Sequence, residues 1–243
     1  MSARAGSASN TRSQPMANNH YEATGVLVLD RVTPVIRALF GGFQLDADYP
    51  GNGDAYIALV ASNPPSWDDL REELVELAKP LGYTSSAQAI PAVGDVLQVL
   101  ARHFGAEGNM ALMSLIGREQ FDDAADLHAL FLLATCFDDG HHLREIRFEG
   151  CWRCDKPRLF EFGGEGQYLS REFDAHSASG HALQLGHLVR EALSSGDFDQ
   201  GATVIAREAS RLLAGIHNAA HRRQLQRRVV WHLIEGLCAD GEQ

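Results

Sequence analysis

The chain has 243 residues, of which 45% are hydrophobic, and its formal net charge is −11. This is enough apolar sequence for one large domain, or for a domain with a smaller appendage. No apolar run reaches the length that crosses a bilayer, so we expect no membrane-spanning segment. The negative charge opposes nonspecific binding to phosphate backbones, and it favours solubility or a basic partner.

The amino-terminal segment is small and polar, and we expect residues 1–20 to form a disordered tail. It lacks the apolar centre of a secretory signal, and either Met1 or Met16 can be the native start. Four cysteines without such a signal indicate a reducing compartment and no disulfide framework, so we expect a cytoplasmic protein. The four are Cys136, Cys151, Cys154 and Cys238.

The first elements in the chain are strands with one short helix between them. Alternating and β-branched residues predict a strand at 22–29, and Thr33 followed by proline predicts the N-cap of a helix at 34–40. Segments 43–49 and 55–60 alternate in the same way and are separated by the turn sequence Pro-Gly-Asn-Gly. They predict a β-hairpin.

A run of helices follows. Ser66 precedes two carboxylates and an apolar stripe, which is the pattern of a capped helix that ends before Pro80. Helical periodicity continues at 93–104, 110–116 and 122–137. The last of these segments is apolar enough to predict a mostly buried helix.

Beyond these helices the pattern changes back to strands. Residues 143–151, 158–162 and 167–173 predict a three-stranded meander. One predicted turn holds the Cys151-x-x-Cys154 pair, and the glycine-rich segment 163–166 predicts the other.

The carboxyl-terminal part predicts three helices, at 178–193, 200–216 and 221–237. The sequence therefore predicts an α+β fold: a mixed or antiparallel sheet with helices on one side, followed by a C-terminal helical bundle. We place the α+β domain at residues 21–175 and the helical region at 176–243.

The Cys-x-x-Cys pair offers three interpretations. A zinc site would join Cys151 and Cys154 to two further ligands, with His141, His142 and Cys136 the nearest in sequence. A redox pair would need the first cysteine at a helix N-terminus, whereas a strand is predicted here. Two ordinary turn cysteines without any cofactor are the remaining interpretation, and zinc is the one cofactor that the sequence suggests.

The last predicted helix carries a basic side opposite an apolar stripe. Arg223, Arg227, Arg228 and Trp231 form the basic side. They predict a surface for an acidic protein or for nucleic acid. A solvated arginine face paired with acidic clusters of the same chain is the alternative. The stripe consists of Leu225, Val229, Leu233 and Leu237.

Two stretches carry a resemblance. Residues 147–164, which read RFEGCWRCDKPRLFEFGG, and residues 21–53 resemble uncharacterised accessory proteins of proteobacterial plasmids and integrative mobile elements. The resemblance implies a modulator or inhibitor of a host defence system. The sequence also lacks any catalytic motif that we recognise. We therefore expect a non-enzymatic protein that binds a macromolecular partner, most readily a protein, with the oligomeric state left open.

Overall fold

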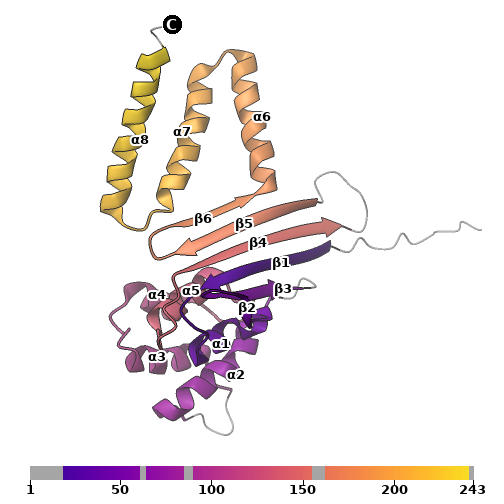
Figure 1. Cartoon of the computed structure of the whole chain (residues 1–243), viewed down its shortest axis with the longest axis vertical. Coiled ribbons are helices and arrows are strands. Elements are labelled where there is room, and N and C mark those ends of the chain that lie inside the picture. The colour runs from indigo at the N-terminus through magenta and orange to yellow at the C-terminus, as the bar shows by residue number, and fades with distance from the viewer. Residues whose placement is uncertain (1–18, 61–63, 85–89, 155–161, 241–243) are drawn as a thin grey trace, which may run out of the picture.

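A six-stranded antiparallel sheet forms the middle of the molecule in the computed structural model, with helices above and below it (Figure 1). The structure describes residues 19–60, 64–84, 90–154 and 162–240, and side chains of the last helix as far as Glu235. The strands are β1 (Asn19–Val28), β2 (Asp46–Gly51), β3 (Asp54–Leu59), β4 (Glu145–Cys154), β5 (Phe162–Ser170) and β6 (Asp174–Ala178), and their order in the sheet is β2-β3-β1-β4-β5-β6.

Five helices lie on the lower side of the sheet in Figure 1. Their apolar faces pack on one face of the strands, where Leu27, Ile57, Ile146 and Phe148 are buried in the core. Because side chains alternate along a strand, other strand residues, such as Thr24 of β1, are exposed on the opposite face of the sheet. The helices are α1 (Pro34–Phe40), α2 (Trp67–Ala78), α3 (Val93–His103), α4 (Met110–Arg118) and α5 (Leu127–Cys136), with short 3₁₀ turns η1 (Gly41–Phe43) and η2 (Lys79–Leu81) after α1 and α2.

Local sequence signals position these elements as predicted. The Ser66 hydroxyl accepts a hydrogen bond from the Asp69 N–H (3.2 Å), and the Asp69 carboxylate accepts one from the Ser66 N–H (2.8 Å), which is a complete capping box. Helix α5 begins at Leu127, whereas the sequence predicted a start at 122. The preceding residues bond to the chain before α2 instead, for example through the Ala125 N–H and the Pro65 carbonyl (2.8 Å).

Three further helices rise from the β6 edge of the sheet, on the side away from α1–α5 (Figure 1). We call them the helical arm: α6 (Ser179–Ser195), α7 (Phe198–Ala214) and α8 (Ala219–Asp240). The foot of the arm is fixed to the end of the sheet by backbone hydrogen bonds from the Asp174 N–H to the Gly215 carbonyl (3.0 Å) and from the His217 N–H to the Glu172 carbonyl (3.0 Å).

The predicted fold class is confirmed, and the sheet is antiparallel. Both predicted turns of the meander were wrong. Cys151 and Cys154 lie within β4, and the glycines at 163–166 lie within β5. Strand β6, which crosses the expected boundary at 175, was not predicted. The expected tail lies outside the described residues up to residue 18, as do residues 158–161 of an expected strand, and β1 begins at Asn19.

Neighbouring aromatic side chains explain three of the strand glycines, Gly25, Gly150 and Gly163. A Cβ at Gly163 would lie 2.2 Å from the ring of Trp152, and one at Gly150 would lie 2.3 Å from the hydroxyl of Tyr21. Gly25 faces Phe148 in the same way. The rings occupy the space that side chains would otherwise fill, so glycine here serves cross-strand packing rather than a turn.

No helix among the described residues is long and apolar enough to cross a membrane.

Candidate functional site

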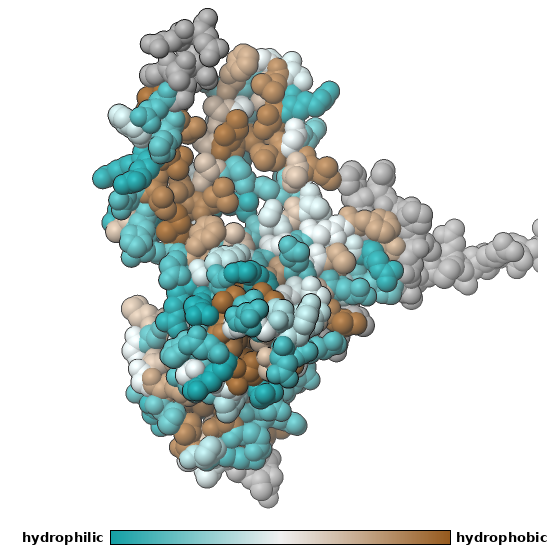
Figure 2. All heavy atoms as spheres, in the orientation of Figure 1, coloured by the Kyte–Doolittle hydropathy of each residue, from teal (hydrophilic) through white to brown (hydrophobic). Residues whose placement is uncertain are grey.

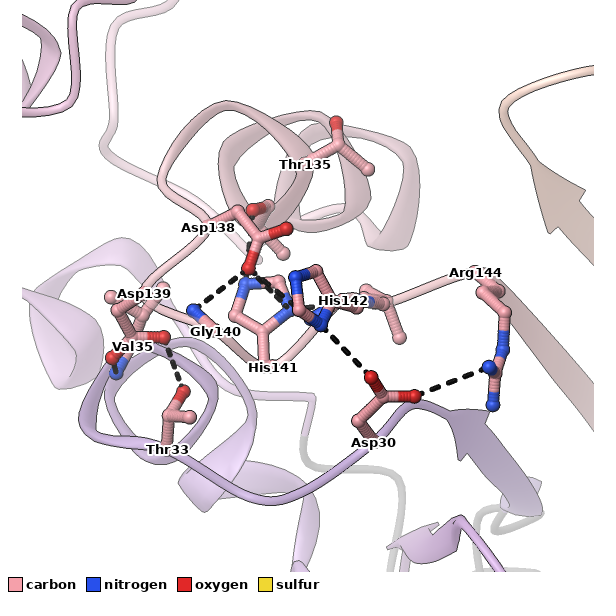
Figure 3. A network of polar contacts seen from close by, with 12 residues as sticks. Asp30, Thr33, Val35, Thr135, Asp138, Asp139, Gly140, His141, His142 and Arg144 are labelled. Carbon is pink, nitrogen blue, oxygen red and sulfur yellow. Dashed lines mark hydrogen bonds and ion pairs between the residues drawn. The ribbon is translucent and has the colours of Figure 1, made fainter.

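The loop between α5 and β4 holds the two histidines proposed as metal ligands (Figure 3). His141 is fully buried, and its Nδ1 accepts a hydrogen bond from the Leu143 N–H (2.8 Å). The ring proton therefore lies on Nε2, which donates to the Ala134 carbonyl (3.1 Å). Burial lowers the pKa of His141, against the pull of Asp138 and Asp139. Both ring nitrogens are thus used in holding the loop.

His142 points the other way and is exposed. Its φ of 47° is left-handed, a conformation that the loop stabilises because Asp138 accepts hydrogen bonds from the N–H groups of Gly140 (2.9 Å) and His142 (3.2 Å). Burial of Asp138 opposes ionisation, but these bonds outweigh it and lower its pKa. The His142 ring lies 2.9 Å from Asp30, which also accepts a hydrogen bond from Arg144 (3.2 Å).

The hollow beside this loop has a volume of about 410 Å³. Its walls carry acidic and basic groups in similar number, and several of these groups are already bonded to neighbouring side chains. Glu145 accepts hydrogen bonds from the Tyr168 hydroxyl and from Arg147, and these bonds lower its pKa. Such self-paired walls favour no one class of ligand. The lining residues include Asp138, His142, Arg144, Tyr168, Arg171 and Glu172.

The structure does not bring the proposed zinc ligands together. Cys151 is exposed and Cys154 is buried, as expected for residues three apart on one strand, whose side chains point to opposite faces. His141 and His142 precede β4, whereas Cys154 ends it, about 30 Å away at the rise of a strand. Cys136, the last residue of α5, accepts a hydrogen bond from the side chain of Asn109. Within the described ranges, no group of three His, Cys, Asp or Glu side chains is placed to hold a metal ion.

A second polar cluster lies on the sheet and was missed from the sequence. The Tyr21 hydroxyl donates to Glu165 (2.7 Å), whose other oxygen lies 3.1 Å from Nε2 of His176. Burial and the hydrogen bond to Glu165 raise the pKa of Tyr21, and the same bond lowers the pKa of Glu165. These residues come from β1, β5 and β6, so only the strand register unites them, and no local motif could have found them.

The helical arm has a well-packed half and an open half. Ala192 on α6 and Gly201 and Val204 on α7 are buried between these two helices, and His181 of α6 lies 2.9 Å from Glu208 of α7. Helix α8 contacts α7 only sparsely. Among its side chains as far as Glu235, none is buried, and all except Arg222 are exposed.

The predicted partner-binding residues therefore lie on an open surface. Arg223, Arg227, Arg228 and Trp231 are all exposed, Trp231 by 61%. The predicted pairing of the arginines with acidic clusters is not seen: no ion pair between described residues involves Arg223, Arg227 or Arg228. The apolar stripe opposite them is open as well. Leu225, Val229 and Leu233 are exposed, and the side chain of Leu237 lies outside the described part.

Exposed apolar side chains gather on the arm, as the brown patches over α7 and α8 in Figure 2 show. Eleven of the sixteen large apolar side chains that are exposed in the described part of the chain belong to α6–α8. The rest are scattered over strands, one helix and connecting segments of the other part. The eleven are Leu183, Leu193, Phe198, Ile205, Leu212, Leu225, Val229, Val230, Trp231, Leu233 and Ile234.

Net charge also differs between the helical region and the rest of the chain. Residues 176–243 contain seven arginines and seven acidic residues, so their formal net charge is zero. The whole of the −11 therefore belongs to residues 1–175. The arm is both the more apolar and the more neutral part of the surface.

Comparison of the chain with known protein families, curated proteins and solved structures finds no match.

Proposed function

We propose that this protein is a non-enzymatic, cytoplasmic binding protein whose helical arm docks on a protein partner. One observation carries the proposal: α8 is a 22-residue helix without a buried side chain in its described part, yet it carries six large exposed apolar side chains. The setting that the resemblance implies, modulation of a host system, belongs to this proposal and rests on the resemblance alone.

The energetics of an open α8 support a covering partner. An isolated helix is only marginally stable in water, and helices in proteins are held mainly by burial of an apolar face. Covering a side chain such as Leu233 or Ile234 is worth about 1.5–3 kcal/mol when burial is complete. Burial of six such side chains would contribute a free energy comparable with the net stability of a whole domain, and α8 lacks that contribution while it is open to water.

The polar clusters support binding rather than catalysis. Both ring nitrogens of His141 bond to the backbone, and Glu165 is shared between Tyr21 and His176. Glu145 is likewise bonded to Tyr168. These groups stabilise the fold, and each is already engaged by neighbouring protein atoms.

Nucleic acid is the second candidate, favoured by Arg223, Arg227 and Arg228 standing exposed on one helix. Neutralisation of phosphates would make such binding weaken steeply with salt. The charge of the chain argues against it, because the arm is neutral as a whole and the adjoining domain is strongly acidic. Absence of binding to single- or double-stranded oligonucleotides at low salt would remove this candidate.

The proposal is tested by two matched substitutions. Leu233→Glu places a carboxylate on α8, and Ile90→Glu places the same group on the α+β domain, where Ile90 is also exposed. A tagged chain is expressed beside an untagged copy in its native cells, and the retained polypeptides are compared by quantitative mass spectrometry. We expect a polypeptide that wild type and Ile90→Glu retain and Leu233→Glu loses. Identical sets of polypeptides for all three chains would contradict the proposal.

A further inference from the structure

We infer that the arm's partner is a second copy of this chain, in a two-fold symmetric dimer whose arms run antiparallel. This rests on the proposed function, since it names the occupant of the same surface. Three observations on the arm support it: a second unfilled apolar stripe, the area of exposed apolar surface, and the placement of charge.

The unfilled stripe is on α7. Phe198, Ile205 and Leu212 are exposed and spaced seven residues apart, so they lie on one line along the helix. This line adjoins the side that packs on α6 but is not covered by it. It has the spacing that receives another helix, and α8, with Leu225, Val229 and Leu233 four residues apart, has the complementary stripe.

Within one chain the two stripes remain apart, because α8 contacts α7 only sparsely. A two-fold axis through the arm would let α8 of each copy cover α7 of the other, and both stripes would be filled by the same contact made twice. Self-association is therefore a complete solution: each copy supplies the helix that the other lacks.

The two stripes supply much of the area that a dimer needs. Their six apolar side chains, exposed by 38–72%, present roughly 600 Å² on each copy, given that a fully buried large side chain contributes on the order of 150–250 Å². A specific protein interface of ordinary size buries about 800 Å² on each partner. The stripes and the side chains around them are therefore of the size that a stable dimer requires.

Charge selects the antiparallel arrangement. Arginines gather at the start of α8, near the sheet, whereas Glu191, Asp197 and Asp199 lie around the α6–α7 turn at the far end of the arm (Figure 1). Antiparallel arms bring the start of α8 of one copy next to the α6–α7 turn of the other. They also hold the two acidic domains at opposite ends of the dimer, where their repulsion is screened.

The test begins with the mass of the full chain in solution. Light scattering and sedimentation velocity across the micromolar range should give twice the 26.5 kDa of one chain. Leu233→Glu, which places a charge on the α8 stripe itself, should yield the single-chain mass, and Ile90→Glu should leave the dimer intact. Because Leu233 is exposed, we expect the fold of the single chain to be unchanged, which circular dichroism checks. A wild-type monomer, or a dimer that only Ile90→Glu breaks, overturns the inference.

A charge swap tests the arrangement of the arms. Arg223→Glu and Asp199→Lys should each raise the dimer dissociation constant several-fold, and the double variant should restore it, because the reversed charges meet again across the interface. A double variant as weak as the two single changes together overturns the antiparallel arrangement.

The two proposals fail in different ways. An arm that retains a different protein from native cells while the purified chain is monomeric overturns the dimer and leaves the proposed function standing. An arm that retains nothing, from a chain that is also monomeric, overturns both.

Discussion

The hydroxyl of Tyr21 on β1 donates a 2.7 Å hydrogen bond to Glu165 on β5, across the whole width of the intervening strand β4. The crossing is possible because the β4 residue between them, Gly150, has no side chain. The side chains of β1 and β5 are thereby joined directly across β4.

Removal of this hydroxyl should weaken the sheet. We expect Tyr21→Phe to lower the free energy of unfolding by about 1–2 kcal/mol, since it leaves a partly buried carboxylate without one of its donors. Urea denaturation at neutral pH measures the change. Tyr49→Phe, at an exposed tyrosine, is the control and should leave stability unchanged. Equal effects of the two substitutions would show that the hydrogen bond contributes nothing.

The same bond gives stability a dependence on acid. The pKa of Glu165 is lowered in the folded protein, chiefly by Tyr21, with a smaller contribution from His176. Its contribution is present above the ordinary carboxyl pKa of 4.5 and is lost as the pH falls through the lower, folded value. Between neutral pH and pH 4, Tyr21→Phe should lose less stability than wild type. A difference between the two proteins that stays constant with pH would contradict this.

His141 should make stability depend on pH in a higher range. Burial lowers its pKa below 6.5, so the unfolded chain takes up a proton that the folded chain resists. The contribution is present above pH 6.5 and falls below it, by at most about 1.4 kcal/mol per pH unit. His141→Gln should flatten the curve, and a curve as steep as that of wild type would contradict this. Urea midpoints between pH 7.5 and 5.5 provide the measurement.

Two glycines in the sheet differ in the space available for a side chain. A Cβ at Gly25 would lie 2.3 Å from the Arg147 carbonyl oxygen, whereas one at Gly166 has no neighbour within 4 Å. We expect Gly25→Ala to destabilise the protein by about 1–3 kcal/mol through overpacking. Gly166→Ala should be neutral or stabilising, because alanine restricts the unfolded chain. Thermal unfolding of both variants checks this, and a similar loss in both would be the wrong result.

The cysteines should react at different rates. Cys151 is exposed and Cys154 is buried, so iodoacetamide should label Cys151 first in the native protein. Peptide mass spectrometry gives the two rates, and elemental analysis of the same sample gives the zinc content. Equal protection of both thiols together with one zinc per chain would restore the metal site that the strand geometry argues against.

Local chemistry was readable from the sequence, and long-range pairing was not. Ser66 and its capping box, and the hairpin of β2 and β3, follow from signals within a few residues. The glycines of β5 read as a turn, and the side chain that explains Gly163, the ring of Trp152, comes from another strand. Glycine in a strand carries no local mark of such a neighbour.

The candidate site divides in the same way. The exposed arginines and Trp231 of α8 were predicted, because helical spacing alone puts them on one surface. That the opposite stripe would also remain open was not predicted, since amphipathic spacing tells which side chains share a face and not what covers it. The cluster of Tyr21, Glu165 and His176 depends on the register of strands more than a hundred residues apart.

The exposed position of Leu233 on the α8 stripe allows the docking of the arm to be observed directly. A photo-crosslinking amino acid is placed at position 233 of the full chain in its native cells, with position 90, also exposed, as the control. Irradiation should join position 233 to a second polypeptide, which mass spectrometry identifies as this chain, and should leave position 90 unlinked. The absence of any adduct at position 233, or equal adducts at both positions, would contradict a protein-binding role for the helical arm.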